Sequence, residues 1–191
     1  DGIKNITSGE GGAIFSKDLK VISKVRDSRL LGVHKDSEKR YSGNRSWEFE
    51  VYYQGYRYHM SNIFAAIGRV QLKRLDNEFG PRRKKIAKYY VKKLSENKNI
   101  KLINVNFENI IPHIFPILVH NNIRKKLIKK FQSNNIQFGL HYKPNHLLNY
   151  YDNGNSLKVC ENIYQKLFTL PLHPEITDNE LDFICKTLNN I

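Results

Sequence analysis

Cysteine is scarce in this sequence, which holds only Cys160 and Cys185 among its 191 residues. Two cysteines do not make a disulfide framework, and they do not supply the ligands of a zinc site. We therefore predict no metal centre. Each cysteine falls in an apolar helical pattern, so we expect both to be small buried hydrophobes in a chain that works in a reducing cytoplasm.

Long hydrophobic runs are also missing. No apolar stretch is long enough to span a bilayer, and the first residues lack the basic, apolar and small-residue order of a signal peptide. Hydrophobic residues nevertheless make up 40% of the chain and aromatic residues 12%. These fractions indicate a globular chain, large enough for one domain or for a domain and part of another.

Acidic residues are few. The chain has 18 of them and 32 lysines and arginines, which gives a net charge of +14. A basic nucleic-acid-binding domain is one interpretation, but it depends on charge alone and no recognised motif supports it. The basic runs at residues 82–85 and 124–126 lie on helical patterns with apolar neighbours. We expect solvated helix faces there, and some cations could instead serve a small anion such as a diphosphate.

Periodicity predicts mainly helices in the first half. Residues 12–15 read as a short buried strand, and Ser16 is a candidate N-cap for the helix after it. Residues 60–79 form a strong helical pattern with Ser61 as N-cap. Gly80-Pro81 marks a break before a second helix over residues 82–94.

The second half alternates helices and strands. Residues 114–119 read as a strand, in which Pro116 suggests a sheet edge or an irregularity. Asn122 is a candidate cap for the helix that follows, and Thr177 with Glu180 forms a capping-box pattern before the last helix. The other predicted elements are a strand at residues 136–140 and a helix at residues 156–167.

A lysine beside a glycine-rich turn carries the strongest chemical signal. Lys4 is followed by Thr-Ser-Gly-Glu-Gly-Gly at residues 7–12. Glycines let the backbone approach a ligand closely, and a lysine in a desolvated pocket becomes a nucleophile that can bind an aldehyde cofactor. The alternative interpretation is a solvated surface residue, as most lysines beside such turns are.

The lysine segment resembles that of the DegT/DnrJ/EryC1/StrS family of pyridoxal-phosphate sugar aminotransferases, in which the cofactor lysine precedes a Thr-x-Gly-Glu-Gly-Gly run. Residues 54–68, leading into 71–76, resemble the family's Gly-Tyr-x-Tyr-x-Met-x-x-Ile-x-Ala-Ala-x-Gly segment. A third block lies at residues 139–146 and 170–174. The three blocks follow one another in the family's order.

The resemblance implies an α/β fold, namely the C-terminal portion of a fold type I PLP-dependent transferase. Residues 1–80 would form the end of the PLP-binding large domain with its dimer-contact segment, and residues 81–191 the α+β small domain. The implied enzyme uses pyridoxal 5'-phosphate to transfer an amino group, with glutamate as expected donor, to a nucleotide-linked keto-sugar. Such reactions serve deoxyamino-sugar and surface-polysaccharide biosynthesis.

The resemblance also assigns roles to residues. Lys4 would bind the cofactor covalently and move protons. Arg57 stands where relatives have an asparagine that reaches the cofactor phosphate of the partner subunit in a homodimer. It could bind that phosphate through charged hydrogen bonds, although it could be only a surface cation. His141, Tyr142 and His146 would contact the nucleotide-sugar.

The resemblance covers only the part of the family that begins near the lysine. The family's aromatic residue that stacks on the cofactor ring, and its acidic partner of the ring nitrogen, precede that point. We therefore expect the isolated chain to be incomplete and inactive. The alternatives are a truncated, catalytically inactive remnant and one half of a split aminotransferase.

Overall fold

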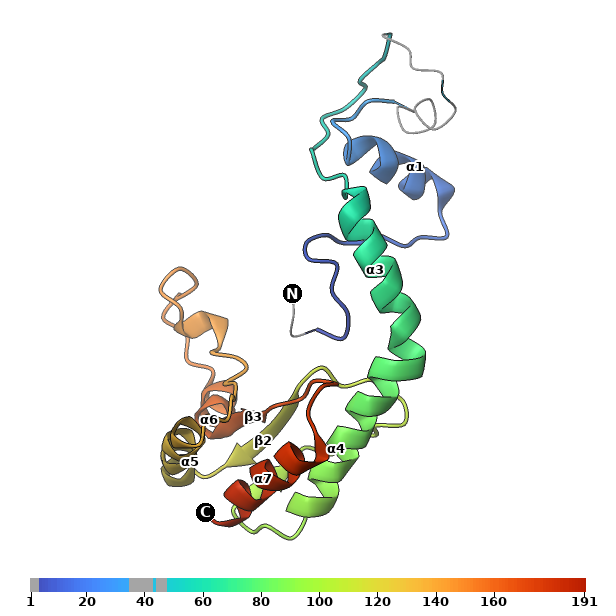
Figure 1. Cartoon of the computed structure of the whole chain (residues 1–191). Coiled ribbons are helices and arrows are strands. Elements are labelled where there is room, and N and C mark those ends of the chain that lie inside the picture. The colour runs from blue at the N-terminus through green and yellow to red at the C-terminus, as the bar shows by residue number, and fades with distance from the viewer. Residues whose placement is uncertain (1–3, 35–42, 44–47) are drawn as a thin grey trace. The chain divides into compact units, whose positions relative to one another are not determined.

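The chain divides into two compact units in the computed structural model, which describes residues 4–34, 43 and 48–191 (Figure 1). Unit 1 comprises residues 7–71. Unit 2 comprises residues 72–191 together with residues 4–6. The boundary at residue 71 falls inside a helix, α3 (Asn62–Arg74).

The first helix of unit 1, α1 (Leu19–Ser28), begins later than the sequence pattern predicts. Its N-cap is Asp18, whose carboxylate accepts a hydrogen bond from the Lys20 amide at 2.8 Å. The predicted cap, Ser16, is therefore wrong. The Ser16 hydroxyl instead accepts from the amide of Asp18 at 3.0 Å, so it supports the capping residue.

The predicted buried strand at residues 12–15 is also wrong. This segment has no regular structure, and the side chains of Ile14 and Phe15 are 62% and 91% exposed. A short extended segment needs neighbouring strands to be stable, and among the described residues none pairs with it.

The chain leaves α1 through a loop that lies beside residues 51–58. Single β-bridges join Leu30 to Arg57 and Val33 to Val51. Gly32 has a φ of +76°, a backbone conformation that favours glycine. A Cβ on Gly55 would overlap the backbone of Leu31 and Gly32. These two glycines therefore allow the close crossing that fixes the backbone around Arg57.

The predicted break at Gly80-Pro81 is absent. After α3 the helix continues as a π-helical turn, η1 (Leu75–Phe79), and then as α4 (Gly80–Leu94). The Gly80 amide donates to the carbonyl of Leu75, five residues earlier. This wider turn lets Pro81, which has no amide hydrogen, enter the first turn of α4 without ending the helix.

After α4, unit 2 contains the elements β1 (Ile100–Leu102), β2 (Phe115–Val119), α5 (Asn121–Ser133), η2 (Asn145–Leu147), α6 (Lys158–Lys166), β3 (Leu167–Leu170) and α7 (Asp178–Asn189). The strands form an antiparallel sheet in the order β1-β2-β3. Helix α4 packs against α7 and β1, whereas α5 contacts both α6 and α7, and α6 contacts β2 (Figure 1).

Pro116 lies in the central strand and not at the predicted edge. It is opposite Thr169 of β3, whose amide and carbonyl both bond to Gly139 on the other side. The Pro116 nitrogen consequently faces the β1 side, at a position beyond Leu102, where β1 ends. Because no ladder bond is required there, the missing amide hydrogen does not interrupt the sheet.

The core of unit 2 lies between this sheet and its helices. Ile86, Tyr90 and Leu94 of α4 are fully buried in it, and Cys185 of α7 is 3% exposed. Burial raises the pKa of the Cys185 thiol to about 11, as expected for an inert core cysteine. Cys160 contradicts the sequence prediction: it is exposed on α6, a helix that buries none of its residues.

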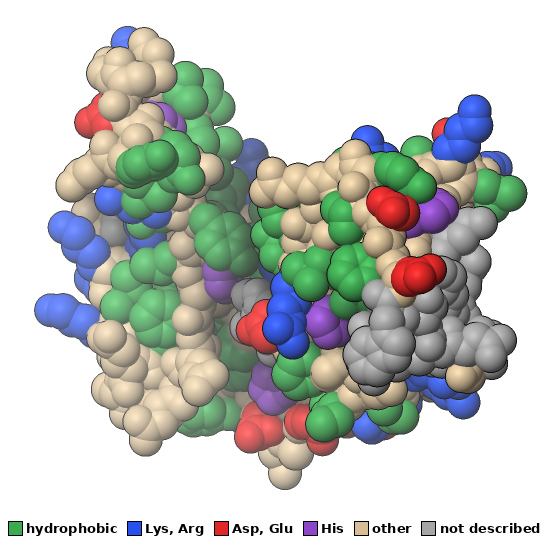
Figure 2. Space-filling model, turned by 90° about the horizontal axis from the view of Figure 1, so that it is seen from above, with side chains coloured by type: hydrophobic (Ala, Val, Ile, Leu, Met, Phe, Trp, Pro, Cys, Tyr) green, Lys and Arg blue, Asp and Glu red, His purple; other side chains and the backbone are tan. Residues whose placement is uncertain are grey.

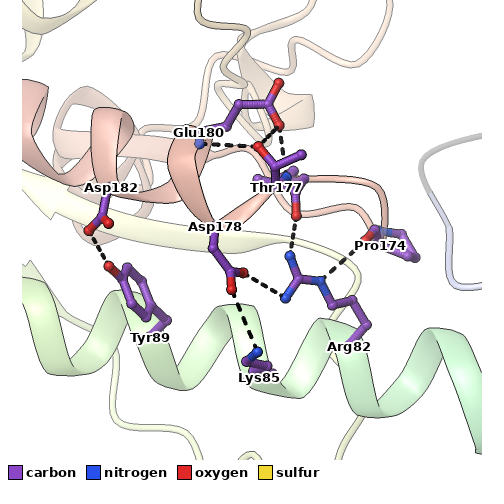
Figure 3. A network of polar contacts seen from close by, with 9 residues as sticks. Arg82, Lys85, Tyr89, Pro174, Thr177, Asp178, Glu180 and Asp182 are labelled. Atoms are coloured by element: carbon purple, nitrogen blue, oxygen red, sulfur yellow. Dashed lines mark hydrogen bonds and ion pairs between the residues drawn. The ribbon is translucent and has the colours of Figure 1, made fainter.

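Of the two helix N-caps predicted from the sequence in unit 2, one is confirmed and one is wrong. The capping box before α7 is confirmed, because the Thr177 hydroxyl accepts from the Glu180 amide while the Glu180 carboxylate accepts from the Thr177 amide (Figure 3). Asn122 is not the cap of α5, whose N-cap position is His120.

Within the described ranges, no helix is both long and apolar enough to cross a bilayer.

Candidate functional site

Lys4 has a fixed backbone and an exposed side chain. Its carbonyl accepts a hydrogen bond from Nη2 of Arg83 at 3.2 Å. The next residue, Asn5, donates from its side-chain amide to the carbonyl of Ile111 at 2.9 Å. Both contacts lie within unit 2, so this short segment is attached to the sheet-containing unit.

A buried arginine lies beside the Lys4 backbone. Arg83 of α4 is 3% exposed, and burial lowers the pKa of its guanidinium. The sequence prediction that the basic run at residues 82–85 is a solvated helix face is therefore wrong for this residue. Arg83 lies on the same face of α4 as Ile86, Ala87 and Tyr90, and this helical spacing is the signal that could have identified it.

A histidine that the sequence analysis did not select belongs to the same neighbourhood. His113 is half-buried just before β2. Burial lowers the pKa of its imidazole, and the positive charges of Lys4, Arg83 and His141 lower it further. The neutral form, which can accept a proton, is thus favoured in a strongly basic surrounding.

The predicted substrate residues begin at His141, which is half-buried, with Nδ1 shielded from solvent and without a hydrogen-bond partner. The ring of Tyr142 meets it edge-on, with centroids 4.6 Å apart. Tyr142 is itself 59% exposed, so its phenol is open to a ligand. The positive charges of Lys4 and His141 both contribute to lowering the pKa of His113.

His146, the third predicted substrate residue, is occupied by an internal contact. Its Nε2 lies 3.1 Å from Oε1 of Glu161, and its side chain is only 11% exposed. The same carboxylate oxygen accepts from the Ser156 hydroxyl and the Leu157 amide. This geometry gives His146 a structural role between η2 and α6, and a contact with a sugar nucleotide stays a prediction.

The glycine turn after Lys4 lies in unit 1, where it packs on α3. The Thr7 amide donates to Gln71 at 3.4 Å, and the Gly9 amide donates to the Thr7 hydroxyl at 3.1 Å. Gly11 has a φ of +140°, and a Cβ there would overlap the methyl group of Met60. Two segments that the sequence analysis singled out, residues 7–12 and 54–76, are therefore in contact.

Arg57, the predicted phosphate ligand, lies in unit 1 with its side chain exposed. Its backbone is held by the bridge to Leu30, and the rings of its neighbours Tyr56 and Tyr58 stack with centroids 5.0 Å apart. The guanidinium is thus presented to solvent from a fixed backbone. That placement suits a contact with a separate subunit, and this role stays a prediction.

The described residues fit a covalently held aldehyde cofactor in one respect. Lys4 offers an exposed amine on a fixed backbone, and among the described carboxylates none forms an ion pair with it. When bound to such a lysine, pyridoxal phosphate supplies the electron sink for amino-group transfer. This chain would then contribute the amine of Lys4 and the basic groups around it.

Known proteins match this chain over nearly all of its length. The spore coat polysaccharide biosynthesis protein SpsC of Bacillus subtilis is 30% identical, and the match covers 98% of this chain and 51% of SpsC. The UDP-4-amino-4,6-dideoxy-N-acetyl-beta-L-altrosamine transaminase of Campylobacter jejuni is 28% identical over 99% of this chain and 50% of its own length. The chain thus spans about half the length of these curated relatives.

Solved structures with the same fold are also sugar aminotransferases. Spr1654 of Streptococcus pneumoniae, solved in its PLP form, superposes with a TM-score of 0.81 at 25% identity, over 98% of this chain and 48% of that one. The architecture is therefore that of PLP-dependent sugar aminotransferases over about half of their length, consistent with a C-terminal portion. The sequence model of the DegT/DnrJ/EryC1/StrS aminotransferase family matches residues 1–189, and the chain belongs to this family.

Proposed function

We propose that this chain forms part of a PLP-dependent enzyme that transfers an amino group, with glutamate as donor, to a nucleotide-linked keto-sugar. The observation that carries the proposal is the family match over residues 1–189. The exposed side chain of Lys4 supports the anchoring role that we propose for it. The relatives named for spore coat polysaccharide and for an amino-sugar transaminase support a role in deoxyamino-sugar and polysaccharide biosynthesis. The proposed compartment is the cytoplasm.

In this proposal Lys4, His141, Tyr142 and Arg57 keep the tasks predicted for them. Lys4 anchors the cofactor and carries protons at its amine. His113, whose carbonyl accepts from Arg83 as that of Lys4 does, offers a second proton-accepting group. His141 and Tyr142 bind the sugar nucleotide, while Arg57 binds phosphate in the partner subunit of a homodimer. Residues 1–80 would belong to the large domain and residues 81–191 to the small domain.

The surface of unit 1 supports a larger assembly. Helix α3 buries none of its residues, and the side chains of Ile63 and Val70 are 73% and 55% exposed. Hydrophobic side chains are visible on the surface of the molecule in Figure 2. Exposed apolar faces of this kind are usually covered by further polypeptide. We propose that the covering polypeptide is the rest of an aminotransferase large domain, since the chain spans about half the length of its relatives.

Fusion of the half of SpsC that lies outside the match, placed before this chain, tests the proposal. Incubation with pyridoxal phosphate, glutamate and a UDP-linked 4-keto-sugar should release 2-oxoglutarate from the fusion and not from the isolated chain. The fusion carrying Lys4→Ala should be inactive. Turnover by the isolated chain would contradict its incompleteness. A fusion that binds the cofactor but transfers no amino group to any nucleotide-linked keto-sugar would contradict the substrate class.

A further inference from the structure

Arg83 is a buried cation without a carboxylate partner among the described residues. It is 3% exposed, and its Nε is buried without a hydrogen-bond partner. Burying a charge in this way is unfavourable, and replacing buried ionic groups by apolar side chains often leaves stability unchanged or improves it. The stability of α4 therefore does not explain why an arginine stands at this position.

The guanidinium instead joins three separate backbone segments. Nη1 donates to the carbonyl of Leu172 at 2.8 Å and to that of His113 at 3.4 Å, whereas Nη2 donates to the carbonyl of Lys4 at 3.2 Å. Leu172 follows β3, and His113 precedes β2. The planar fork of an arginine can hold several acceptors in fixed directions, which a single ammonium group cannot do.

The segment has a second attachment to unit 2 through Asn5. Its Nδ2 donates to the carbonyl of Ile111, two residues before His113. Lys4 and Asn5 are thus attached at consecutive residues, one through the backbone and one through the side chain. The Lys4 side chain takes no part in either contact and remains exposed. The two contacts fix the backbone from which the Lys4 side chain extends, and they leave the amine of that side chain available.

We propose that Arg83 is a positioning residue for Lys4: its fork holds the Lys4 carbonyl against the sheet-containing unit, with Asn5 as a second attachment. The importance of this position for amino-group transfer rests on the proposed function of Lys4. The attachment itself does not depend on that function, because it consists of contacts between described residues alone.

Trypsin provides a direct probe, because it cleaves after lysine by attacking the carbonyl that Arg83 holds. Cleavage at the Lys4–Asn5 bond of the full chain is measured by mass spectrometry and divided by the rate for an unstructured peptide of residues 1–12. The ¹⁵N order parameter of the Asn5 amide reports the same segment without a protease. Arg83→Met removes the fork, and Arg83→Lys keeps the charge without the fork.

Arg82 supplies a matched control on the same helix. It also donates to backbone carbonyls, those of Pro174 at 3.3 Å and of Ile176, and it pairs with Asp178 at 3.0 Å (Figure 3). None of these groups belongs to the Lys4 segment. Arg82→Met therefore removes an arginine with similar contacts from α4 and leaves the proposed attachment in place.

If Arg83 holds this segment, Arg83→Met should increase the normalised rate of cleavage at the Lys4–Asn5 bond about tenfold or more. This is the effect expected from loss of a hydrogen bond to a charged group. The Asn5 order parameter should fall, and Arg82→Met should change neither quantity. Arg83→Lys should resemble Arg83→Met. Wild-type values in Arg83→Met, equal effects in both arginine variants, or full rescue by lysine would each overturn the proposal.

A second variant keeps the proposal testable if Arg83→Met does not fold. Asn5→Ala removes the other attachment without touching the core, and it should lower the order parameter of the residue 5 amide in an otherwise folded chain. An unchanged order parameter would overturn the two-point attachment. Lys4→Ala activity, measured in the SpsC fusion, separately decides the proposed function, so failure of one claim is distinguishable from failure of the other.

Discussion

The imidazole of His141 occupies the space that a side chain at Gly139 would need. A Cβ built on Gly139 would overlap three atoms of the His141 ring. The Gly139 backbone is fixed at the same time, because its amide and carbonyl both bond to Thr169 of β3, at 3.0 and 2.8 Å. The glycine therefore cannot move away, and the position of the predicted sugar-binding histidine depends on it.

The first prediction follows from this overlap. Gly139→Ala should lower the free energy of unfolding by about 1–3 kcal/mol, the usual effect of forcing an extra methyl group into a filled site. His141→Ala in the same chain should recover most of the loss. Urea unfolding of both single variants and the double variant gives the coupling energy. Additive effects would show that the ring and the glycine do not compete for space.

The capping box before α7 gives the second prediction. Thr177→Ala removes the hydroxyl that accepts from the Glu180 amide and should lower the free energy of unfolding by about 1 kcal/mol. Thr177→Ser keeps a hydroxyl at the same position and serves as the control. Chemical denaturation measures both variants, and equal losses in the two would mean that the hydroxyl does not contribute through capping.

The third prediction concerns the pKa of Glu161. The hydrogen bond from His146 is the largest cause that lowers the pKa of this carboxyl, followed by that from the Leu157 amide. Because the folded-state pKa is lowered, the contribution to stability is present above the unfolded value of about 4.3. It is lost as pH falls through the folded-state pKa.

Carboxyl ¹³C titration of Glu161 measures this shift. His146→Ala should raise the pKa of Glu161 toward the ordinary range, whereas Ser156→Ala should raise it less, because the Ser156 hydrogen bond is a smaller cause. A Glu161 pKa that is identical in the wild type and in His146→Ala would contradict the structural role given to His146.

His141 and His146 should therefore behave differently in the SpsC fusion. His141→Ala should weaken use of the sugar nucleotide by several-fold, the loss of about one hydrogen bond, and leave cofactor absorbance intact. His146→Ala should act mainly on thermal stability. Steady-state kinetics with each substrate, beside the cofactor spectrum, distinguishes the two. Loss of cofactor in His141→Ala, with unchanged use of the sugar, would place the loop on the cofactor side.

Local signals in the sequence predicted several elements well. The hydroxyl and carboxylate of Thr177 and Glu180 satisfy amides within one turn, so the start of α7 could be read from residues three apart. The inward stripe of α4 could also be read, because Ile86, Tyr90 and Leu94 recur at helical spacing. Such features are fixed by contacts within a few residues and need no knowledge of the sheet.

Features that depend on distant partners could not be predicted in this way. Arg83 follows the same spacing as the buried stripe, but the carbonyls that satisfy it lie on segments far away in sequence. Pro116 fits a central strand only because β1 ends before it. Phe15 has an apolar pattern but stays exposed, since no described strand pairs with its segment. The link between the carbonyls of His113 and Lys4 through Arg83 has no local sequence signal at all.

Covalent trapping of pyridoxal phosphate on Lys4 tests the central claim most directly. The SpsC fusion is incubated with the cofactor, reduced with borohydride and digested, and peptide masses locate the modified lysine. We expect the modification on Lys4, with exposed Lys17 of the same chain much less modified. Modification of another lysine while Lys4 remains unmodified would contradict the claim that Lys4 anchors the cofactor.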